Sequence, residues 1–417
     1  MDAIPRPFAT EHDARLDKLA EVAVRVGLGL VPGQEIVLTA PLVAAPLVRR
    51  ITEHAYRVGA KLVSPLFSDD ATALSRFEHA PSEAFDYAPA WLYDGMARAF
   101  EAGAARLAIG GEDPTLLAGQ DADRVARANR SRSIAYRPAL ELITNFATNW
   151  TIVCYATPAW ARIVFPDLSE TDGVARLWDA IFAASRIDGP DPVGAWASHN
   201  AGLHARTAAL NAKRFASLHF RGPGTDLVVG LADGHLWAGG SEPSKNGIVC
   251  NPNIPTEEVF TTPHMSRVDG VVRSTKPLSY QGTLIEGIEV RFEGGKIVQS
   301  AATSGHPVLE RVLGTDDGAR RLGEVALVPH SSPISASGLL FFNTLFDENA
   351  ASHIALGQSY RTCIEGGTTA NDAELARRGA NSSLIHIDWM IGSGEIDVDG
   401  LDAAGNAEPL MRRGEFI

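Results

Sequence analysis

Cysteine is scarce in this sequence of 417 residues, with only Cys154, Cys250 and Cys363 present. A disulfide framework needs paired cysteines, and a thiolate zinc site needs them at short spacing. The three cysteines are odd in number and far apart, which argues against both. Any metal that the chain binds must therefore take oxygen and imidazole ligands.

Clusters of basic residues and long apolar runs are missing as well. The 37 basic and 50 acidic residues give a formal net charge of −13, and such a field repels phosphate backbones. The sequence therefore predicts neither nucleic acid nor membrane as a partner. The N-terminal stretch MDAIPRPFATEHDARLDKL also lacks the basic start and apolar segment of a secretory signal, which favours a cytoplasmic protein.

No glycine-rich phosphate loop is present either. Such a loop lies between a strand and the next helix, whereas the glycines of VGLGLVPGQ, RVGAK and EAGAAR follow predicted helices and precede predicted strands. A nucleotide-binding domain is therefore not predicted. The composition, with 45% hydrophobic and 21% charged residues, is globular, and the length favours two domains.

Helices and short apolar strands alternate in the first part of the chain. The predicted elements, in chain order, are strand 35–38, helix 42–58, strand 61–65, helix 90–102 and strand 106–109. This alternation is typical of a parallel sheet covered by helices. An N-terminal α/β domain with a mostly parallel sheet is therefore predicted over residues 1–190.

The segment DGPDP, residues 188–192, marks the predicted domain boundary because its prolines and glycine suit a turn or linker. A helix is predicted beyond it over residues 193–214. Short strands separated by hairpin-like turns such as ADG and EGG follow, predicted at 217–220, 226–230, 271–274, 287–292 and 296–300. The C-terminal domain, residues 191–417, is therefore predicted as α+β with antiparallel strands.

Three glutamates of this half are candidate site residues. Glu257 and Glu258 lie in the extended stretch NPNIPTEEVFTTPH, so one is expected to face inward if the other faces water. An inward carboxylate needs a cation, and a solvated acidic pair is the alternative. Glu324 enters the apolar strand EVALV, where a carboxylate is costly without a partner. An ion pair with Arg320 or Arg321 at a strand edge is the alternative there.

His353 and Tyr360 form a second group of candidates. His353 lies in LFDENAASHIALGQSY, which predicts a helix over residues 347–356 that ends at Gly357. Tyr360 follows directly, so an imidazole and a phenol lie near one helix end. A core histidine on an apolar helix face is the alternative.

His386 and Asp388 lie in the extended run SLIHIDWMIG. Residues two apart share one face of a strand, while Ile385, Ile387 and Trp389 fill the other face. Two potential ligands thus project together from an otherwise apolar strand. A hydrogen-bonded histidine–aspartate pair is the alternative for this motif alone.

Together these residues form the ligand set of dizinc, dicobalt or dimanganese hydrolases. The chain resembles, over essentially its whole length, the thermophilic metalloaminopeptidases of the aminopeptidase T and S type. NIPTEEVFTTP resembles the stretch with the family's first glutamate ligand, GEVALVP the second, NTLFDENAASHIALGQSY its histidine and tyrosine ligands, and HIDWMIG its last histidine and aspartate. The implied metal ligands are Glu258, Glu324, His353, Tyr360, His386 and Asp388.

The resemblance implies a metal-dependent aminopeptidase with two divalent ions, zinc, cobalt or manganese. It further implies a homodimer and an enclosed cavity that admits short peptides. A general acid or base is required to move protons between water and the leaving amine, and we expect Glu257 or a ligand glutamate to serve. Tyr360 is expected to stabilise charge or to bind metal. His264 and His330 are expected to border the cavity.

Two other functions stay open at this point. His353, His386 and Asp388 alone would form the two-histidine, one-carboxylate triad of a mononuclear iron enzyme, and ring-cleaving dihydroxypyridine dioxygenases look similar to this peptidase family. That alternative gives no task to the glutamates or to Tyr360. A metal-free protein that binds a small ligand at the strand ends of the N-terminal domain is the other alternative.

Overall fold

The computed structural model describes residues 10–280 and 283–417. The first nine residues of the N-terminal stretch MDAIPRPFATEHDARLDKL lie outside this description. The chain forms two compact units. The first comprises Met1–Ser198 with Ser241–Pro255, and the second comprises His199–Gly240 with Thr256–Ile417. The inclusion of residues 241–255 in the first unit was not predicted from the sequence.

The first unit contains a parallel sheet of the order β2-β1-β3-β4. Its strands are β1 (Glu35–Pro41), β2 (Leu62–Ser68), β3 (Ala105–Gly110) and β4 (Trp150–Cys154). The helices are α1 (Glu11–Val22), α2 (Ala45–Val58), α3 (Asp70–His79), α4 (Ala90–Glu101), α5 (Ala122–Thr144), α6 (Pro158–Val164), α7 (Glu170–Ala184) and α8 (Pro192–Lys213), whose last part belongs to the second unit. The predicted α/β architecture with a mostly parallel sheet is confirmed.

Glycine ends helix α2, as the sequence predicted. Gly59 follows α2 with a φ of 104°, a left-handed conformation that a residue with a Cβ adopts at a cost. Its N–H donates to the Ala55 and Tyr56 carbonyls, which closes the helix and returns the chain to β2. Among the described residues, no helix has an apolar stretch that could cross a lipid bilayer.

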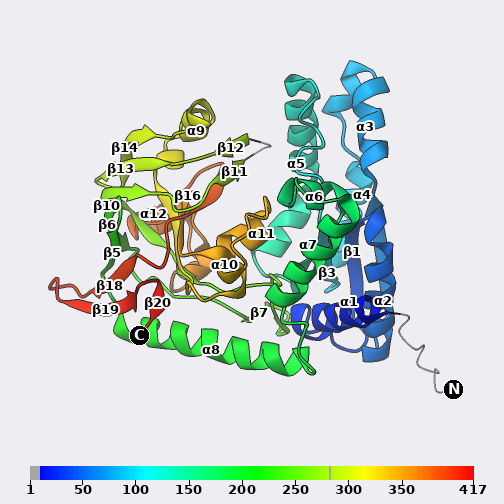
Figure 1. Ribbon diagram of the computed structural model, residues 1–417, viewed down its shortest axis with the longest axis horizontal. Helices are drawn as coiled ribbons and strands as arrows, with labels where there is room; N and C mark the ends of the chain where they lie inside the picture. Colours follow the sequence, from blue (N-terminus) through cyan, green and yellow to red (C-terminus); the bar gives the residue numbers. More distant parts are fainter. Residues whose placement is uncertain (1–9, 281–282) are drawn as a thin grey trace. The chain divides into compact units, whose positions relative to one another are not determined.

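The second unit is built on antiparallel strands, as predicted (Figure 1). An eight-stranded sheet has the order β14-β13-β10-β6-β5-β18-β19-β20. Its strands are β5 (Ser217–Gly222), β6 (Thr225–Leu231), β10 (Pro263–Arg273), β13 (Glu289–Glu293), β14 (Lys296–Ala301), β18 (Asp397–Leu401), β19 (Ala407–Arg412) and β20 (Glu415–Phe416). Leu218, Phe220, Leu227 and Val229 contribute fully buried side chains to the core of this unit.

A second, four-stranded antiparallel sheet in this unit has the order β17-β16-β15-β9. It comprises β9 (Val259–Thr261), β15 (Leu322–Leu327), β16 (His353–Gly357) and β17 (His386–Met390). The short hairpin of β11 (Leu278–Tyr280) and β12 (Thr283–Ile285), and the helices α9 (His306–Leu313), α10 (Pro333–Ser337), α11 (Thr344–Asp347) and α12 (Asp372–Arg377), complete the unit. The pair β7 (Glu242–Pro243) and β8 (Val249–Cys250) belongs to the first unit.

The helix predicted over residues 347–356 is wrong. Helix α11 ends at Asp347, a 3₁₀ turn follows over Glu348–Ala350, and His353 begins strand β16. Ladder pairing on both sides and complete burial outweigh the helical preference of the alanines in ENAASHIALG, because a central strand satisfies every backbone group of a buried segment. His353 therefore projects from a strand.

Candidate metal centre

The four-stranded sheet places four of the predicted ligands on one face. Glu324 on β15 lies beside Ala355 on β16, which lies beside Asp388 on β17. His353 lies two residues before Ala355, and His386 two residues before Asp388. Laterally paired residues and residues two apart share a face of a sheet, so all four side chains point to the same side.

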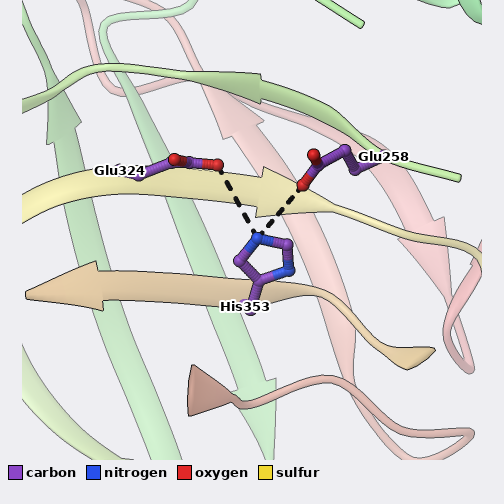
Figure 2. A group of neighbouring side chains, drawn as sticks. All are labelled: Glu258, Glu324 and His353. Carbon is purple, nitrogen blue, oxygen red and sulfur yellow. Dashed lines mark ion pairs between the residues drawn. The ribbon is translucent and has the colours of Figure 1, made fainter. Parts of the chain in front are cut away.

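Glu258 directly precedes β9 and joins the other four residues. Its Oε2 lies 3.1 Å from His353 Nε2, and Glu324 Oε1 lies 3.6 Å from the same nitrogen (Figure 2). His386 Nε2 lies 3.3 Å from Glu324 Oε2 and 3.5 Å from Asp388 Oδ1. Glu324 thus faces one histidine with each of its oxygens. We refer to Glu258, Glu324, His353, His386 and Asp388 as the carboxylate–histidine cluster.

Both imidazoles are oriented in the same way. His353 Nδ1 lies 3.1 Å from the Ala351 carbonyl oxygen, and His386 Nδ1 lies 2.7 Å from that of Gln358. A carbonyl only accepts, so each Nδ1 carries the hydrogen, and Nε2 of the neutral ring presents its lone pair to the carboxylates. Acceptors that face acceptors need a proton or a metal ion between them. This orientation by a carbonyl is usual for metal-binding histidines.

Burial and charge shift the protonation of these groups. Burial raises the pKa of Glu258. Burial alone would lower the pKa of His353, but the Glu258 and Glu324 carboxylates outweigh it and hold the pKa well above its usual value. His386 is likewise raised well above its usual pKa, against the effect of burial, by Asp388 and Glu324. Each histidine therefore attracts a positive charge to the space before its Nε2.

A metal ion fits these residues better than protein partners do. Glu258 Oε2 is buried and takes part in no hydrogen bond of good geometry with any residue that the structure describes. In the same part of the chain, no Lys or Arg pairs with Glu258, Glu324 or Asp388. The residues fall into two groups with ligand atoms within 4.8 Å of one another: Glu258, Glu324 and His353, and Glu324, His386 and Asp388. Oxygen and imidazole ligands suit zinc, cobalt and manganese.

The alternative for Glu324, a surface pair with a neighbouring arginine, does not apply. Arg320 pairs with Glu310 at 3.2 Å, and Arg321 pairs with Asp317 at 3.8 Å. Glu324 is buried instead.

Tyr360 lies beside the cluster. The centre of its ring is 4.8 Å from that of His386 and 5.9 Å from that of Phe260. The residue is 43% exposed, yet the surrounding protein withdraws its phenol from water, and this together with the charges of Glu324 and Asp388 raises its pKa well above the usual value. Its neutral hydroxyl can donate a hydrogen bond next to the cluster.

The expectation that one of Glu257 and Glu258 faces water is wrong, because both are buried, with 3% and 7% of their surface exposed. The Glu257 N–H donates to Asn349 Oδ1 at 2.7 Å, and its Oε2 lies 3.8 Å from His199 Nε2. Helix α8, through His199, and the 3₁₀ turn, through Asn349, thus both contact Glu257.

Glu348 is a further acidic residue near the cluster that the sequence did not single out. It lies in the 3₁₀ turn before β16, half-buried. Burial, and then the negative charges of Glu258 and Asp388, raise its pKa well above the usual value. The sequence shows a glutamate five residues before His353. The helix wrongly predicted over residues 347–356 gave no reason to place that glutamate near the carboxylate–histidine cluster.

His264 and His330 are not members of the two ligand groups. The His264 ring lies so close to Gly379 that a Cβ at that glycine would stand 2.1 Å from the ring. His330 Nδ1 lies 3.2 Å from Ser335 Oγ, and its backbone N–H donates to the Gly414 carbonyl. Both rings have packing contacts with nearby loops.

Comparisons with known proteins find relatives over nearly the whole chain. Residues 12–416 match the family described as thermophilic metalloprotease (M29). The chain is 58% identical to aminopeptidase T of Thermus thermophilus over 402 residues, which are 96% of this chain and 98% of that protein. It is 47% identical to aminopeptidase 2 of Geobacillus stearothermophilus, with 97% and 98% covered.

The fold agrees with a solved structure as well. Wild-type AmpT from Thermus thermophilus superposes with a TM-score of 0.92 at 57% sequence identity, over 97% of this chain and 99% of that one. The alternative of a ring-cleaving dioxygenase receives no support from these relatives. The chain belongs to the thermophilic metalloprotease family M29.

Proposed function

We propose that this protein is a metalloaminopeptidase that removes the N-terminal residue from short peptides and that holds two divalent ions at the carboxylate–histidine cluster. The observation that carries the proposal is the placement of Glu324, whose two oxygens face different histidines. A carboxylate in this position suits a bridge between two cations. The aminopeptidase names of the relatives support the reaction.

The two groups of neighbouring side chains support two positions. Glu258, His353 and one oxygen of Glu324 would hold one ion, and His386, Asp388 and the other oxygen of Glu324 would hold the second. Tyr360 stands next to His386 and is proposed to complete the second position. Zinc, cobalt and manganese all accept these ligands. When bound, such ions polarise a carbonyl group and increase the acidity of water.

Other side chains are proposed to position the substrate and to move protons. Tyr360 can donate its hydroxyl hydrogen to the oxygen that becomes negative when water attacks the carbonyl. Glu257 or Glu348 is proposed to accept a proton from water and return it to the leaving amine, because Glu257 is buried next to the ligand Glu258 in the chain and Glu348 lies close enough to Glu258 and Asp388 to be affected by their charges. Glu257 is the residue predicted from the sequence, and Glu348 comes from the structure.

Restriction to the N-terminal residue follows if the free amine of the peptide is held at the cluster. An internal peptide bond has no amine to offer, so it is not brought within attack distance. Cobalt, zinc or manganese as the native ion, a homodimer and a cytoplasmic location stay predictions from the resemblance.

The test uses aminoacyl chromogenic substrates with protein that has been stripped by a chelator and reloaded with zinc, cobalt or manganese. We expect hydrolysis only after reloading, and no cleavage of the same peptide with an acetylated N-terminus. Glu324→Gln should abolish activity, whereas Glu310→Gln, a control whose carboxylate pairs with Arg320 on the surface, should retain it. Full activity of chelated protein, or cleavage of the acetylated peptide, would refute the proposal.

A further inference from the structure

Strand β17 is an edge strand of the four-stranded sheet. It pairs with β16 on one side, and the described residues supply no strand on its other side. Unpaired edges are usually blocked by lysine, proline or very short length, because open N–H and C=O groups recruit other chains. Residues 384–391, LIHIDWMI, contain neither lysine nor proline. Neither a blocking residue nor a neighbouring strand therefore closes this edge.

The direction of each backbone group of β17 follows from the hydrogen bonds at its two ends. Gln358 N–H donates to the Ile385 carbonyl at 2.7 Å, and Ile391 N–H donates to the Ser352 carbonyl at 2.9 Å. Residues two apart point their backbone groups the same way, so the odd-numbered residues bond to β16. The N–H and C=O groups of His386 and Asp388 therefore point to the outer edge.

The described residues supply no backbone partner for the His386 N–H or for the His386 and Asp388 carbonyls, whereas the Asp388 N–H faces its own carboxylate. The next outward carbonyl, that of Met390, accepts from Thr275 N–H at 2.9 Å, which closes the edge at that end. At the other end Leu384 is 86% exposed. The Leu384 N–H donates to Asp316 Oδ2 at 2.7 Å, so the free part of the edge comprises His386 and Asp388, long enough to pair with about two residues of an extended chain.

The same two residues supply side chains to the carboxylate–histidine cluster. His386 and Asp388 present their ligand atoms on the sheet face and their free backbone groups at the sheet edge. A chain that paired with this edge would lie about 4.8 Å from β17 and pass directly beside the cluster. Backbone pairing of this kind gives affinity without a demand on side-chain sequence.

We infer that the outer edge of β17 binds the main chain of the peptide substrate, on the carboxyl side of the bond that is cleaved, as an added strand. The inference rests on the proposed aminopeptidase function and specifies its substrate as an extended peptide that has at least one peptide bond beyond the one cleaved. The N-terminal residue then lies over the cluster, and the leaving portion lies along His386 and Asp388.

The kinetic test compares three tripeptides, one of them an ester analogue, and one nitroanilide as substrates of the metal-loaded enzyme. They are a leucyl tripeptide, the same tripeptide N-methylated at its second peptide bond, its ester analogue, and leucyl nitroanilide, which has no second peptide bond. Removing one hydrogen bond to the edge should lower kcat/KM about tenfold for the methylated tripeptide. An ester in place of the second peptide bond removes the N–H without adding a methyl group. It should lower kcat/KM as well. Equal kcat/KM values for all three tripeptides would overturn the inference.

Leucyl nitroanilide separates this inference from the function on which it rests. If the nitroanilide is cleaved and the tripeptides do not differ, the edge does not bind substrate although the enzyme is an aminopeptidase. If neither the nitroanilide nor the tripeptides are cleaved by loaded protein, the proposed function itself fails.

Hydrogen exchange provides a readout that does not depend on turnover. A tripeptide analogue with a reduced, non-cleavable first bond should slow amide exchange in residues 384–391 of the metal-loaded protein, and its N-methylated form should not. Strand β14, which is an edge of the eight-stranded sheet, is the matched control and should be unchanged. If the analogue does not change the exchange rates of residues 384–391, the inference is contradicted.

Discussion

Each unit of the molecule buries a polar cluster, but the two clusters are satisfied in different ways. In the first unit, Gln34, Thr148 and Asn149 are buried and neutral. Gln34 Nε2 donates to Asn149 Oδ1 at 2.6 Å, Asn149 Nδ2 donates to the Leu28 carbonyl at 2.7 Å, and Thr148 Oγ1 donates to the Ala104 carbonyl at 2.9 Å. Donors meet acceptors throughout, so this amide cluster is complete without a ligand.

In the second unit, the carboxylate–histidine cluster consists of acceptors that face one another. Three carboxylates meet two Nε2 lone pairs, and the histidines' own hydrogens are already given to carbonyl groups. Burying such groups is costly unless positive charge compensates. The comparison shows that a polar cluster points to an absent ion when its donors and acceptors do not balance.

The largest effect is expected from Glu324→Gln, which removes a carboxylate that faces both histidines. Changing a residue that only supports a metal ligand costs about 10- to 100-fold in affinity or activity, so loss of a shared ligand should exceed a hundredfold in kcat/KM. Assays with saturating metal measure it. A kcat/KM of the variant within tenfold of the wild-type value would contradict the claim that the carboxylate–histidine cluster, unlike the amide cluster, needs an ion.

Chelation should lower the melting temperature of the wild-type protein. A bound ion at 100 times its dissociation constant stabilises the folded state by about 2.7 kcal/mol per site. Calorimetry with and without chelator should show this shift in the wild type and a much smaller one in Glu324→Gln. An identical melting temperature in both conditions would mean that the cluster is stable without an ion.

Asn149→Ala should produce the opposite pattern. Truncation removes the donor of the Leu28 carbonyl and of the Gln34 side-chain oxygen and should lower the free energy of unfolding by about 1–3 kcal/mol. Metal content and kcat should stay at the wild-type level, because this residue belongs to the first unit. Urea unfolding and metal analysis of one preparation test both statements. Loss of bound metal in this variant would contradict them.

The smallest effect is expected at Asp347, on the pH dependence of stability. Unlike the carboxylates of the carboxylate–histidine cluster, this buried carboxylate accepts hydrogen bonds from backbone N–H groups. Burial raises its pKa from 3.8 to about 6, against the hydrogen bonds from Phe341 and Asn343. Its contribution to stability is therefore fully present below about pH 3.8 and is lost as the pH rises through about 6.

Asp347→Asn removes this titration. The difference in free energy of unfolding between variant and wild type should shift in favour of the variant as the pH rises from about 4 to about 7, whatever its value at the starting pH. Urea unfolding at a series of pH values measures the difference. A constant difference over this range would contradict the assigned shift.

The sequence predicted the elements of both units where the pattern was local. The alternation of apolar strands and glycine-ended helices predicted the parallel sheet, and the period of two in HIDWM predicted that His386 and Asp388 share a face. The strand at His353 was missed because its conformation is set by β15 and β17, which are distant in sequence. Local alanine content carries no information on that pairing.

The motifs named candidate ligands, but they did not predict how these residues face one another. Motifs named the residues, whereas the facing of Glu324 toward both histidines depends on the register of three strands. The burial of both Glu257 and Glu258 and the position of Glu348 depend on the same tertiary contacts. The open edge of β17 likewise follows only from knowing which strand has a single neighbour.

Anomalous diffraction from crystals grown with zinc tests the central claim most directly. Two peaks are predicted, one within about 2.0–2.3 Å of ligand atoms of Glu258, His353 and Glu324, and the other at the same range from Glu324, His386 and Asp388. The absence of a peak at the cluster, or a single peak that leaves His386 and Asp388 without a metal, would contradict the account.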